Sequence, residues 1–507
     1  MFRKLILVLL LLPLAGWAQF NNNYWVFGDS AGIYWNGSVP SVIYSEIQGR
    51  GTTVNLSDSN GMLLSSQTAY TYSVFNTTKT FNKFFLPILG SDSIIGEGWY
   101  HEMVIIPVPE SDSLAYIFSI GVTIPPNFGL YYTLINYRAN NDSGLVIQKN
   151  MQLNNAPAFD GLAAIRHGNG RDWWLVFQRW DNAGIIQYND FFSYKISSSG
   201  ITTNLTQNLG PSHTTGGGQF LFNTSGNKCL NLSWRGLLCL YDFDRCTGLL
   251  SNPLTIEQER SAAPYPYYVS GVFSPDDSKI YLAAYTHPNG INFVDTLYQF
   301  DLDATNIAQS KLAIYSAANA DIGLAAMKLA PDNKIYLTTV DLSASIPYPD
   351  SLYTQFNTNL SVINQPDSLG LACDFQPFSF YLGGARTYYG LPNNPDYELG
   401  AWVGSPCDTL SVGVQHPEPT ETLQPFLQAW YNHGWDMIHV NASKLQGKKG
   451  VLRLVDIEGR IVFEKPAEVI SGGYFTTEIY THEISDGVYV VHLVTDRETW
   501  SFKVGKL

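Results

Sequence analysis

Residues 271–282 read Gly-Val-Phe-Ser-Pro-Asp-Asp-Ser-Lys-Ile-Tyr-Leu, and residues 326–337 read Ala-Met-Lys-Leu-Ala-Pro-Asp-Asn-Lys-Ile-Tyr-Leu. Both stretches predict a strand, a tight turn and a second strand. The proline presets the backbone for the turn, the aspartate can accept hydrogen bonds from the backbone that follows, and the Ile-Tyr-Leu run is typical of a strand. The shared pattern therefore predicts a β-hairpin that recurs along the chain.

Weaker copies of this hairpin pattern precede the two clear ones. They span 54–64, 104–118, 163–177 and 220–232, and the six turns fall near residues 58, 111, 169, 225, 276 and 332. A repeat of about 55 residues with several strands in each unit is typical of a β-propeller. We therefore expect an all-β fold in which residues 19–407 form a propeller of about seven four-stranded blades.

The two ends of the propeller are expected to meet. The chain opens on Tyr-Trp-Val-Phe-Gly-Asp-Ser-Ala-Gly-Ile-Tyr-Trp-Asn at 24–36, which resembles the later strands of a blade. A ring that was left open would expose unpaired strand edges. We therefore expect residues near 375–390 to pair with residues 24–36 and close the last blade.

Composition supports short strands joined by turns. Charged residues make up 14% of the 507 residues and aromatic residues another 14%, with 43 glycines and 26 prolines. This mixture favours strands and turns over long helices. The net charge of −14 repels nucleic acid and anionic lipid, so neither is an expected partner.

The N-terminus is typical of a secretory signal peptide. A basic start precedes the apolar run 5–12, and a small-x-small pattern ends at Ala18. The apolar run is too short to span a membrane. We expect residues 1–18 to be removed by cleavage between Ala18 and Gln19, and we expect no membrane span in the mature chain.

Five cysteines follow in a chain that is expected to enter an oxidising compartment, where disulfides persist. Cys373 and Cys407 bracket a stretch rich in glycine, proline and asparagine. We expect them to form a disulfide, because it would tie down a segment with few strand signals. Cys229, Cys239 and Cys246 form a second group whose pairing stays open, because spacing alone does not decide connectivity.

A separate module follows the propeller. Residues 408–425 contain a proline-rich acidic stretch that predicts a linker. Residues 426–507 predict a small Ig-like β-sandwich. In its last strand Trp500, Phe502 and Val504 alternate with polar residues, so their side chains should pack onto the core of the sandwich.

Three motifs mark this C-terminal module. They are Leu-Val-Asp-Ile-Glu-Gly-Arg at 454–460, Ile-Ser-Asp-Gly-Val-Tyr at 484–489 and Phe-Lys-Val-Gly-Lys-Leu at 502–507. In order and spacing they resemble the type A sorting domain of type IX secretion. The resemblance implies that an outer-membrane translocon reads the domain, which is normally removed afterwards. The implied signal residues are Gly459, Arg460, Gly487, Tyr489 and Lys503.

The module departs from the family pattern at two points. The Pro-Asn-Pro that is usual near the start of the domain is replaced by His-Pro-Glu-Pro at 416–419, and Gly505 stands where an apolar residue is usual. Both departures bear on the domain boundary and the cleavage point.

The propeller also resembles a known class of proteins. The segments 24–36, 240–248, 390–393 and 404–408 and the Ser-Pro-Asp turn are similar to those of large surface propellers in Gram-negative bacteria with type IX secretion. This resemblance implies a protein that is secreted or attached to the outer face of the outer membrane. It implies no particular reaction.

Motifs for a catalytic, cofactor or metal site are missing from the sequence. The glycine run at 214–218 lacks the Lys-Ser or Lys-Thr of a phosphate loop. The aspartates near two turns lack the pattern of a calcium loop and are expected to cap turns, and the histidines lack zinc-ligand spacing and are expected in solvated or hydrogen-bonded loops. These residues are Asp242, Asp244, Asp301, Asp303, His101, His167, His213 and His287.

Three functions remain open. The first is a non-catalytic binding or adhesion module for an unidentified extracellular ligand, a glycan or a protein, and it is the one that we favour. The second is a secreted glycan-active hydrolase, which would need paired carboxylates or, for sialic acid, an arginine cluster. The third is a structural component of a surface layer. Candidate arginines are Arg138, Arg166, Arg179 and Arg235, and candidate sugar-stacking aromatics are Trp173, Trp174, Trp180 and Tyr188, although core packing is the expected role of the aromatics.

Overall fold

A computed structural model describes most of the chain. The described residues are 20–69, 78–96, 101–121, 129–158, 160–179, 188–213, 217–260, 266–286, 294–317, 321–343, 351–408, 426–432, 436–443, 445–446, 449–468 and 475–506. The expected signal peptide, the Ala18–Gln19 cleavage point and linker residues 409–425 lie outside these ranges.

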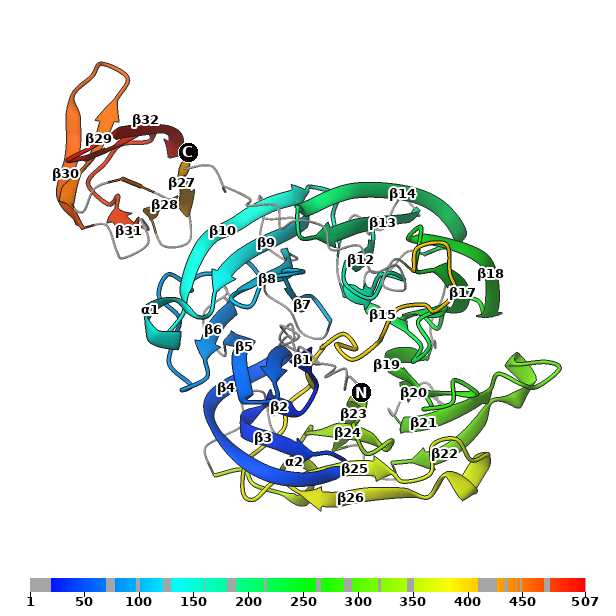
Figure 1. Ribbon diagram of the computed structural model, residues 1–507. Coiled ribbons are helices and arrows are strands. Elements are labelled where there is room, and N and C mark those ends of the chain that lie inside the picture. The colour runs from blue at the N-terminus through cyan, green and yellow to red at the C-terminus, as the bar shows by residue number, and fades with distance from the viewer. Residues whose placement is uncertain are drawn as a thin grey trace, which may run out of the picture.

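Antiparallel sheets stand around a common centre (Figure 1). Five sheets of four strands follow one another along the chain, and their early strands lie near the centre while their last strands lie at the rim. Their strands are β7 (Met103–Pro107), β8 (Leu114–Gly121), β9 (Gly129–Asn136), β10 (Leu145–Asn154), β11 (Ala163–Arg166), β12 (Trp173–Gln178), β13 (Tyr188–Ser197), β14 (Gly200–His213), β15 (Gly218–Phe222), β16 (Lys228–Ser233), β17 (Leu238–Asp244), β18 (Leu249–Glu257), β19 (Tyr267–Phe273), β20 (Lys279–Thr286), β21 (Val294–Asp301), β22 (Leu312–Ser316), β23 (Ile322–Leu329), β24 (Ile335–Asp341), β25 (Asn359–Ile363) and β26 (Phe375–Tyr381). Short helical turns connect some of them: α1 (Ala139–Asp142), η1 (Ala308–Ser310), α2 (Gln355–Thr358) and η2 (Gly370–Cys373).

The first strands of the chain complete the ring. They are β1 (Phe20–Asn21), β2 (Tyr24–Phe27), β3 (Asp29–Asn36), β4 (Val39–Asp58), β5 (Gly61–Ala69) and β6 (Thr78–Asn82). The first half of β4 pairs with β3 and its second half pairs with β5. The expected all-β propeller is therefore confirmed, while the count of about seven blades depends on whether the two halves of β4 are counted as one sheet or two.

Each of the six turns predicted from the repeat connects the two strands of a hairpin. The hairpins are β4–β5, β7–β8, β11–β12, β15–β16, β19–β20 and β23–β24. In the two clear repeats the turn chemistry is the expected one. The carboxylate of Asp276 accepts a hydrogen bond from the backbone N–H of Ser278 at 2.9 Å, and that of Asp332 accepts one from Lys334 at 3.1 Å. The side chain therefore satisfies a backbone donor that the tight turn leaves unpaired.

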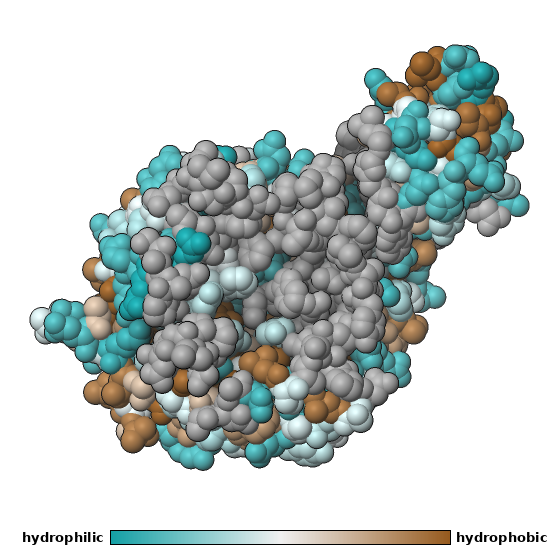
Figure 2. All heavy atoms as spheres, turned by 180° about the vertical axis from the view of Figure 1, so that it is seen from behind, coloured by the Kyte–Doolittle hydropathy of each residue, from teal (hydrophilic) through white to brown (hydrophobic). Residues whose placement is uncertain are grey.

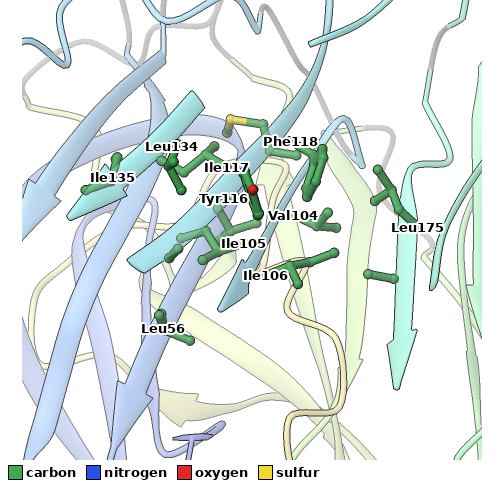
Figure 3. Close-up of a cluster of buried hydrophobic side chains, with 14 of the residues drawn as sticks. Leu56, Val104, Ile105, Ile106, Tyr116, Ile117, Phe118, Leu134, Ile135 and Leu175 are labelled. Carbon is green, nitrogen blue, oxygen red and sulfur yellow. The ribbon is translucent and has the colours of Figure 1, made fainter. Parts of the chain in front are cut away.

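Apolar side chains between neighbouring sheets hold the ring together. One cluster joins β4 and β5 to the sheets of β7–β10 and β11–β14, and Figure 3 shows part of it, with Leu56, Ile105 and Leu175 coming from three different sheets. Further clusters join each of the following sheets to the next. Because each sheet buries apolar residues on both faces, its strands read as nearly continuous apolar runs, such as Met-Val-Ile-Ile-Pro in β7.

Both ends of the propeller meet, as expected. The backbone of Asp29 exchanges two hydrogen bonds with that of Arg386, at 2.8 and 3.1 Å, and their side chains form an ion pair at 2.5 Å. Beside this pair, Trp25 and Trp35 pack edge-on against Tyr336 from β24. The first and last parts of the propeller sequence thus share one core.

The C-terminal residues form two sheets around a core of their own. One contains β27 (Phe426–Asn432), β28 (Met437–Ser443) and β31 (Phe475–Tyr480), and the other contains β29 (Lys449–Asp456), β30 (Ile461–Glu468), β32 (Gly487–Thr495) and β33 (Thr499–Lys506). Val504 is buried, and Trp500 and Phe502 pack against the same core. The expected facing of the last strand is confirmed.

Hydrophobic and hydrophilic residues are interspersed on the described part of the surface in Figure 2. Single exposed apolar side chains are ordinary on proteins. Among the described residues there is no helix that is long and apolar enough to cross a membrane.

Candidate functional site

A segment of the chain runs through the centre of the ring. After β26 the chain turns inward, and in Figure 1 its yellow-to-orange trace passes between β1 and β15. We call residues 391–399 the plug. The N–H of Asn393 donates to the carbonyl of Thr53 at 2.7 Å, and its side-chain amide donates to the carbonyls of Met103 and Leu162 at 2.9 and 3.0 Å. A single asparagine thus joins three sheets.

The rest of the plug is held in the same way. The hydroxyl of Tyr397 donates to the carbonyl of Ile105 at 2.8 Å, and the N–H of Asn55 donates to the side-chain oxygen of Asn394 at 2.7 Å. Tyr397 is 2% exposed, and its burial raises the pKa of its hydroxyl. Strand edges that face a channel leave backbone groups without partners. The amides and the hydroxyl of the plug supply those partners, which explains an asparagine-rich segment at this place.

Two arginines fasten the exit of the plug. Arg166 donates to the carbonyl of Tyr397 at 2.5 Å, and Arg245 donates to the carbonyls of Gly400 and Arg166 at 2.5 and 2.8 Å. Burial lowers the pKa of Arg166 to about 10, with the nearby Asp396 opposing the change. Both guanidinium groups therefore bind backbone carbonyls and are not gathered in an open anion site.

The expected Cys373–Cys407 disulfide is wrong. Cys407 is bonded to Cys246, across 161 residues of sequence, with the Cα atoms 5.5 Å apart. The reason is the path of the plug, which carries Cys407 through the ring to the turn between β17 and β18. Cys373 stays behind in η2 as a buried thiol.

The three-cysteine group does not pair within itself either. Cys246 is taken by Cys407, while Cys229 and Cys239 remain buried thiols on β16 and β17. Burial raises the pKa of both thiols. At neutral pH they are protonated and unreactive core residues.

A cavity of about 310 Å³ lies beside the plug. Its walls come from the first strands of five sheets, β7, β11, β15, β19 and β23, from Asn22 and from the plug itself. The volume is at the lower end of the range of about 300–1,000 Å³ that is usual for small-molecule sites. Its polar lining includes Asn22, Lys328, Asn394, Asp396 and Glu398, and its apolar lining includes Phe222, Val272 and Leu399.

Two amides in the cavity wall have one half of their hydrogen-bonding capacity unused. The amide nitrogen of Asn22 donates to the carbonyl of Pro395 at 3.1 Å, whereas its oxygen is buried without a partner. The oxygen of Asn394 accepts from Asn55, whereas its nitrogen is buried without a partner. Leaving such a group unpaired costs about 1–3 kcal/mol. Both unpaired atoms have almost no accessible surface, so they lie behind the cavity wall and are not offered to a ligand in the cavity.

Charges of both signs meet at the cavity. Lys328 donates to the carbonyl of Asn394 at 3.1 Å, and burial lowers the pKa of its ammonium group to about 8, opposed by Asp396. Asp396 and Glu398 are both exposed. Partial burial, and then the neighbouring Asp396, raise the pKa of Glu398.

A chain of buried polar contacts links the early strands around the centre. The carboxylate of Asp160 accepts from the N–H of Gly218 at 3.1 Å, and burial followed by the charge of Glu102 raises its pKa strongly. The side-chain oxygen of Gln219 accepts from the N–H of Gly271 at 2.7 Å in the next sheet. No spacing rule could have found these partners, because each contact joins two different repeats.

The four candidate arginines bind different partners, and two of the candidate aromatics are core residues. Arg138 lies beside Asp58 and Asp142, Arg179 lies over the ring of Tyr188, Arg166 holds the plug, and Arg235 lies in the turn after β16. Arg166 and Arg179 both belong to the sheet of β11–β14, whereas Arg138 follows β9 and Arg235 follows β16, and the four hold different partners. Trp173 and Trp174 are buried, as expected for core residues. Trp180 lies outside the described residues.

The histidines and aspartates are mostly structural. His101 is a buried residue of the loop before β7, and burial lowers its pKa to about 4, so it is neutral at pH 7. His167 contacts the carbonyl of Cys246 at 3.1 Å. Asp244 and Asp301 accept backbone hydrogen bonds two residues on, as expected of turn caps, whereas Asp242 lies within β17 and pairs with Lys228 at 2.7 Å.

The glycine run and the remaining two histidines were also singled out in the sequence. Gly218 begins β15, so the glycine run leads into a strand. The side chain of His213 and the whole of His287 lie outside the described residues. Within the described ranges, His, Cys, Asp and Glu form no group of three that could hold a metal.

The five residues of the implied sorting signal fall at two places in the sandwich. Gly459, with φ of +82°, and Arg460 form the turn between β29 and β30, where Arg460 pairs with Asp456 at 2.8 Å. Gly487 and Tyr489 belong to β32. Lys503 belongs to the neighbouring strand β33, where it lies opposite Val490 of β32. Tyr489 is buried and its hydroxyl donates to the carbonyl of Ser485 at 2.5 Å, whereas Arg460 and Lys503 are exposed.

Comparisons with known proteins give distant structural likeness only. No protein family's model matches the chain. No curated protein matches it. Among solved structures, puromycin hydrolase aligns with a TM-score of 0.40 and 9% identity, covering 85% of this chain and 58% of that one. Luciferin-regenerating enzyme aligns at 0.35 and 10%, covering 74% and 97%. The β-propeller domain of Cps50 (Swd1) from Myceliophteria thermophila aligns at 0.34 and 8%, covering 65% and 95%. At this distance the titles carry no argument about chemistry, and the fold is read from the sheets themselves.

Proposed function

We propose that the protein is an exported surface β-propeller that binds an extracellular ligand without transforming it, and that its C-terminal sandwich directs its delivery by type IX secretion. The observation that carries the binding proposal is the cavity beside the plug. It is preformed, it lies where five sheets converge, and donors, acceptors and apolar side chains share its wall. Rigid scaffolds of this kind place recognition groups with little ordering cost on binding.

The plug makes the cavity rigid. Asn393 and Tyr397 anchor it to the carbonyls of the early strands, and the Cys246–Cys407 disulfide fixes its exit. The groups that the plug presents to the cavity, Asn394, Asp396 and Glu398, are therefore held in place before a ligand arrives.

An array of glycans and extracellular proteins, probed with the purified full chain, tests the binding proposal. Any hit is then incubated with the protein and analysed for cleavage by mass spectrometry. We expect retention of at least one ligand and no product. Turnover would favour the hydrolase, and a complete lack of binding would favour the structural role.

The export proposal has a separate support, which is the placement of the motif residues. Arg460 and Lys503 are exposed, so a translocon could contact them without unfolding of the sandwich. The double substitution Arg460→Ala and Lys503→Ala should retain the protein inside the cell envelope. Ile457→Ala is the matched control, because Ile457 is 83% exposed and lies in the same turn. Unchanged surface display of the double variant would contradict the proposal.

A further inference from the structure

One lysine in the wall of the cavity has few partners for its charge. Lys328 belongs to β23 and lines the cavity together with Asn394 and Asp396 of the plug. Its ammonium group donates to the carbonyl of Asn394 at 3.1 Å and lies 5.9 Å from the centre of the Trp25 ring. An ammonium group has three donors. Within the described part of the chain, the carbonyl of Asn394 is its one hydrogen-bond partner.

Other lysines of similar burial are paired with a carboxylate. Lys195 and Lys311 are half-buried, as Lys328 is. Lys195 pairs with Asp172 at 3.0 Å. Lys311 pairs with Glu257 at the same distance. Among the described residues no carboxylate forms such a pair with Lys328. Because a charge that is withdrawn from water is normally paired, an ammonium group without an ion pair at a cavity is a candidate for function.

Withdrawal from water also makes the Lys328 amine reactive near neutral pH. Burial lowers the pKa of its ammonium group to about 8, and the charge of Asp396 opposes the change. At pH 7.5 about a quarter of such amines are neutral, compared with about 0.1% of amines with the ordinary lysine pKa of about 10.4. The neutral amine is the form that attacks a carbonyl carbon, and a desolvated lysine is a common nucleophile of this kind.

We propose that the cavity binds a small molecule that carries an aldehyde group and holds it reversibly as an imine on Nζ of Lys328. The proposal rests on the proposed binding function and names the chemical class of the ligand. The neutral amine adds to the carbonyl carbon, so that a C–N bond forms, and the carbonyl oxygen leaves as water with the two amine protons. A C=N bond remains. No oxidant or reductant takes part, and hydrolysis of the imine returns the aldehyde unchanged.

The size and the lining of the cavity suit this chemistry. Its volume of about 310 Å³ limits the ligand to a small molecule. Apolar residues, among them Phe222, Val272 and Leu329, form part of the same wall as Lys328. A site that holds little water protects an intermediate that water would hydrolyse. Because imine formation releases water, a partly apolar wall favours the imine over the free aldehyde.

Reductive trapping on the full chain tests the proposal. The protein is incubated at pH 7.5 with benzaldehyde as the probe and with sodium cyanoborohydride, which reduces an imine to a stable secondary amine. Peptide mass spectrometry then measures the modified fraction of each lysine over time. We expect Lys328 to be modified at least about tenfold faster than Lys79, because a larger fraction of its amine is neutral. Lys79 is the internal reference, since it is exposed on β6.

A variant that narrows the cavity ties the reaction to this place. Glu398 is exposed and lines the cavity, so Glu398→Trp puts a bulky ring at its wall. This variant should slow the modification of Lys328 and leave that of Lys79 unchanged. Glu398→Gln is the matched control, because it removes the charge and keeps the size of the side chain. Thermal unfolding of each variant establishes that it is folded.

The outcomes separate the proposal from the binding function on which it rests. Modification of Lys328 that is no faster than that of Lys79 would overturn the proposal. An unchanged rate at Lys328 in Glu398→Trp would also overturn it, because the reaction would then not need the cavity. The array tests the binding function independently. A ligand retained there while Lys328 stays unreactive would remove the aldehyde class and leave the binding function standing, whereas failure of both experiments would overturn both.

Discussion

The Cys246–Cys407 disulfide should contribute a large part of the stability of the ring. It closes a loop of 161 residues, and for a loop of that length the loss of chain entropy in the unfolded state corresponds to about 5 kcal/mol at 25 °C. The double substitution Cys246→Ser and Cys407→Ser should therefore lower the free energy of unfolding by up to about 5 kcal/mol. Urea unfolding under oxidising conditions measures this difference. Ser405→Ala is the control, because Ser405 lies 3.4 Å from both sulfurs and its removal leaves the bond intact.

Hydrogen exchange distinguishes the effect of the disulfide on residues 400–408 from its effect on the plug. Residues 400–408 depend on the disulfide and on Arg245, so their amides should exchange faster in the double variant. The amide of Asn393 is bonded to Thr53 and should stay protected. A loss of stability below about 1 kcal/mol, which is the size of an average point substitution, would refute the reasoning. Non-reducing peptide mapping that finds Cys373 bonded to Cys407 would refute it directly.

Two further predictions concern the ring. Asn393→Ala removes the amide that donates to the carbonyls of Met103 and Leu162, so it should lower the free energy of unfolding by about 2–3 kcal/mol. Gln365→Ala, at an exposed position, is the control and should leave the free energy of unfolding unchanged. Equal stabilities of the two variants in urea unfolding would contradict the role given to the plug. Burial raises the pKa of Asp295 from 3.8 to about 8, so the folded state holds a proton that the unfolded state releases above pH 4. The contribution of Asp295 to the free energy of unfolding should therefore be fully present below about pH 4 and should fall by about 1.4 kcal/mol per pH unit as the pH rises toward 8. Asp295→Asn should remove that slope, and urea unfolding at pH 5 and pH 7.5 measures it; an unchanged slope would show that Asp295 is not the source.

Much of the architecture could be predicted from local patterns. The Pro-Asp turns at 276 and 332 revealed the repeat, because the same short-range hydrogen bond closes each hairpin. The need to leave no open edge predicted that residues near 375–390 would meet residues 24–36, and the bridge between Asp29 and Arg386 is where they do so. The alternation of Trp500, Phe502 and Val504 predicted the face of the last strand, because side chains in a strand alternate with a period of two.

The cysteine pairing shows where such reasoning ends. Cys373 is the cysteine that lies nearest to Cys407 in sequence, but the plug carries Cys407 away from Cys373 and across the ring. An extended segment without regular structure has no periodic signal, so nothing in residues 391–399 predicts its place. The contacts of Asn393 with three sheets exist only once those sheets surround it.

What the sequence determined by itself is the set of local structures: hairpins at a spacing of about 55 residues, a strand-rich ring and a separate C-terminal sandwich. Turn chemistry and alternation act over a few residues, so they can be read along the chain. The path of the plug, the Cys246–Cys407 bond and the cavity were decided only by the tertiary structure. Each of them depends on groups that are far apart in sequence and are brought together by the closing of the ring.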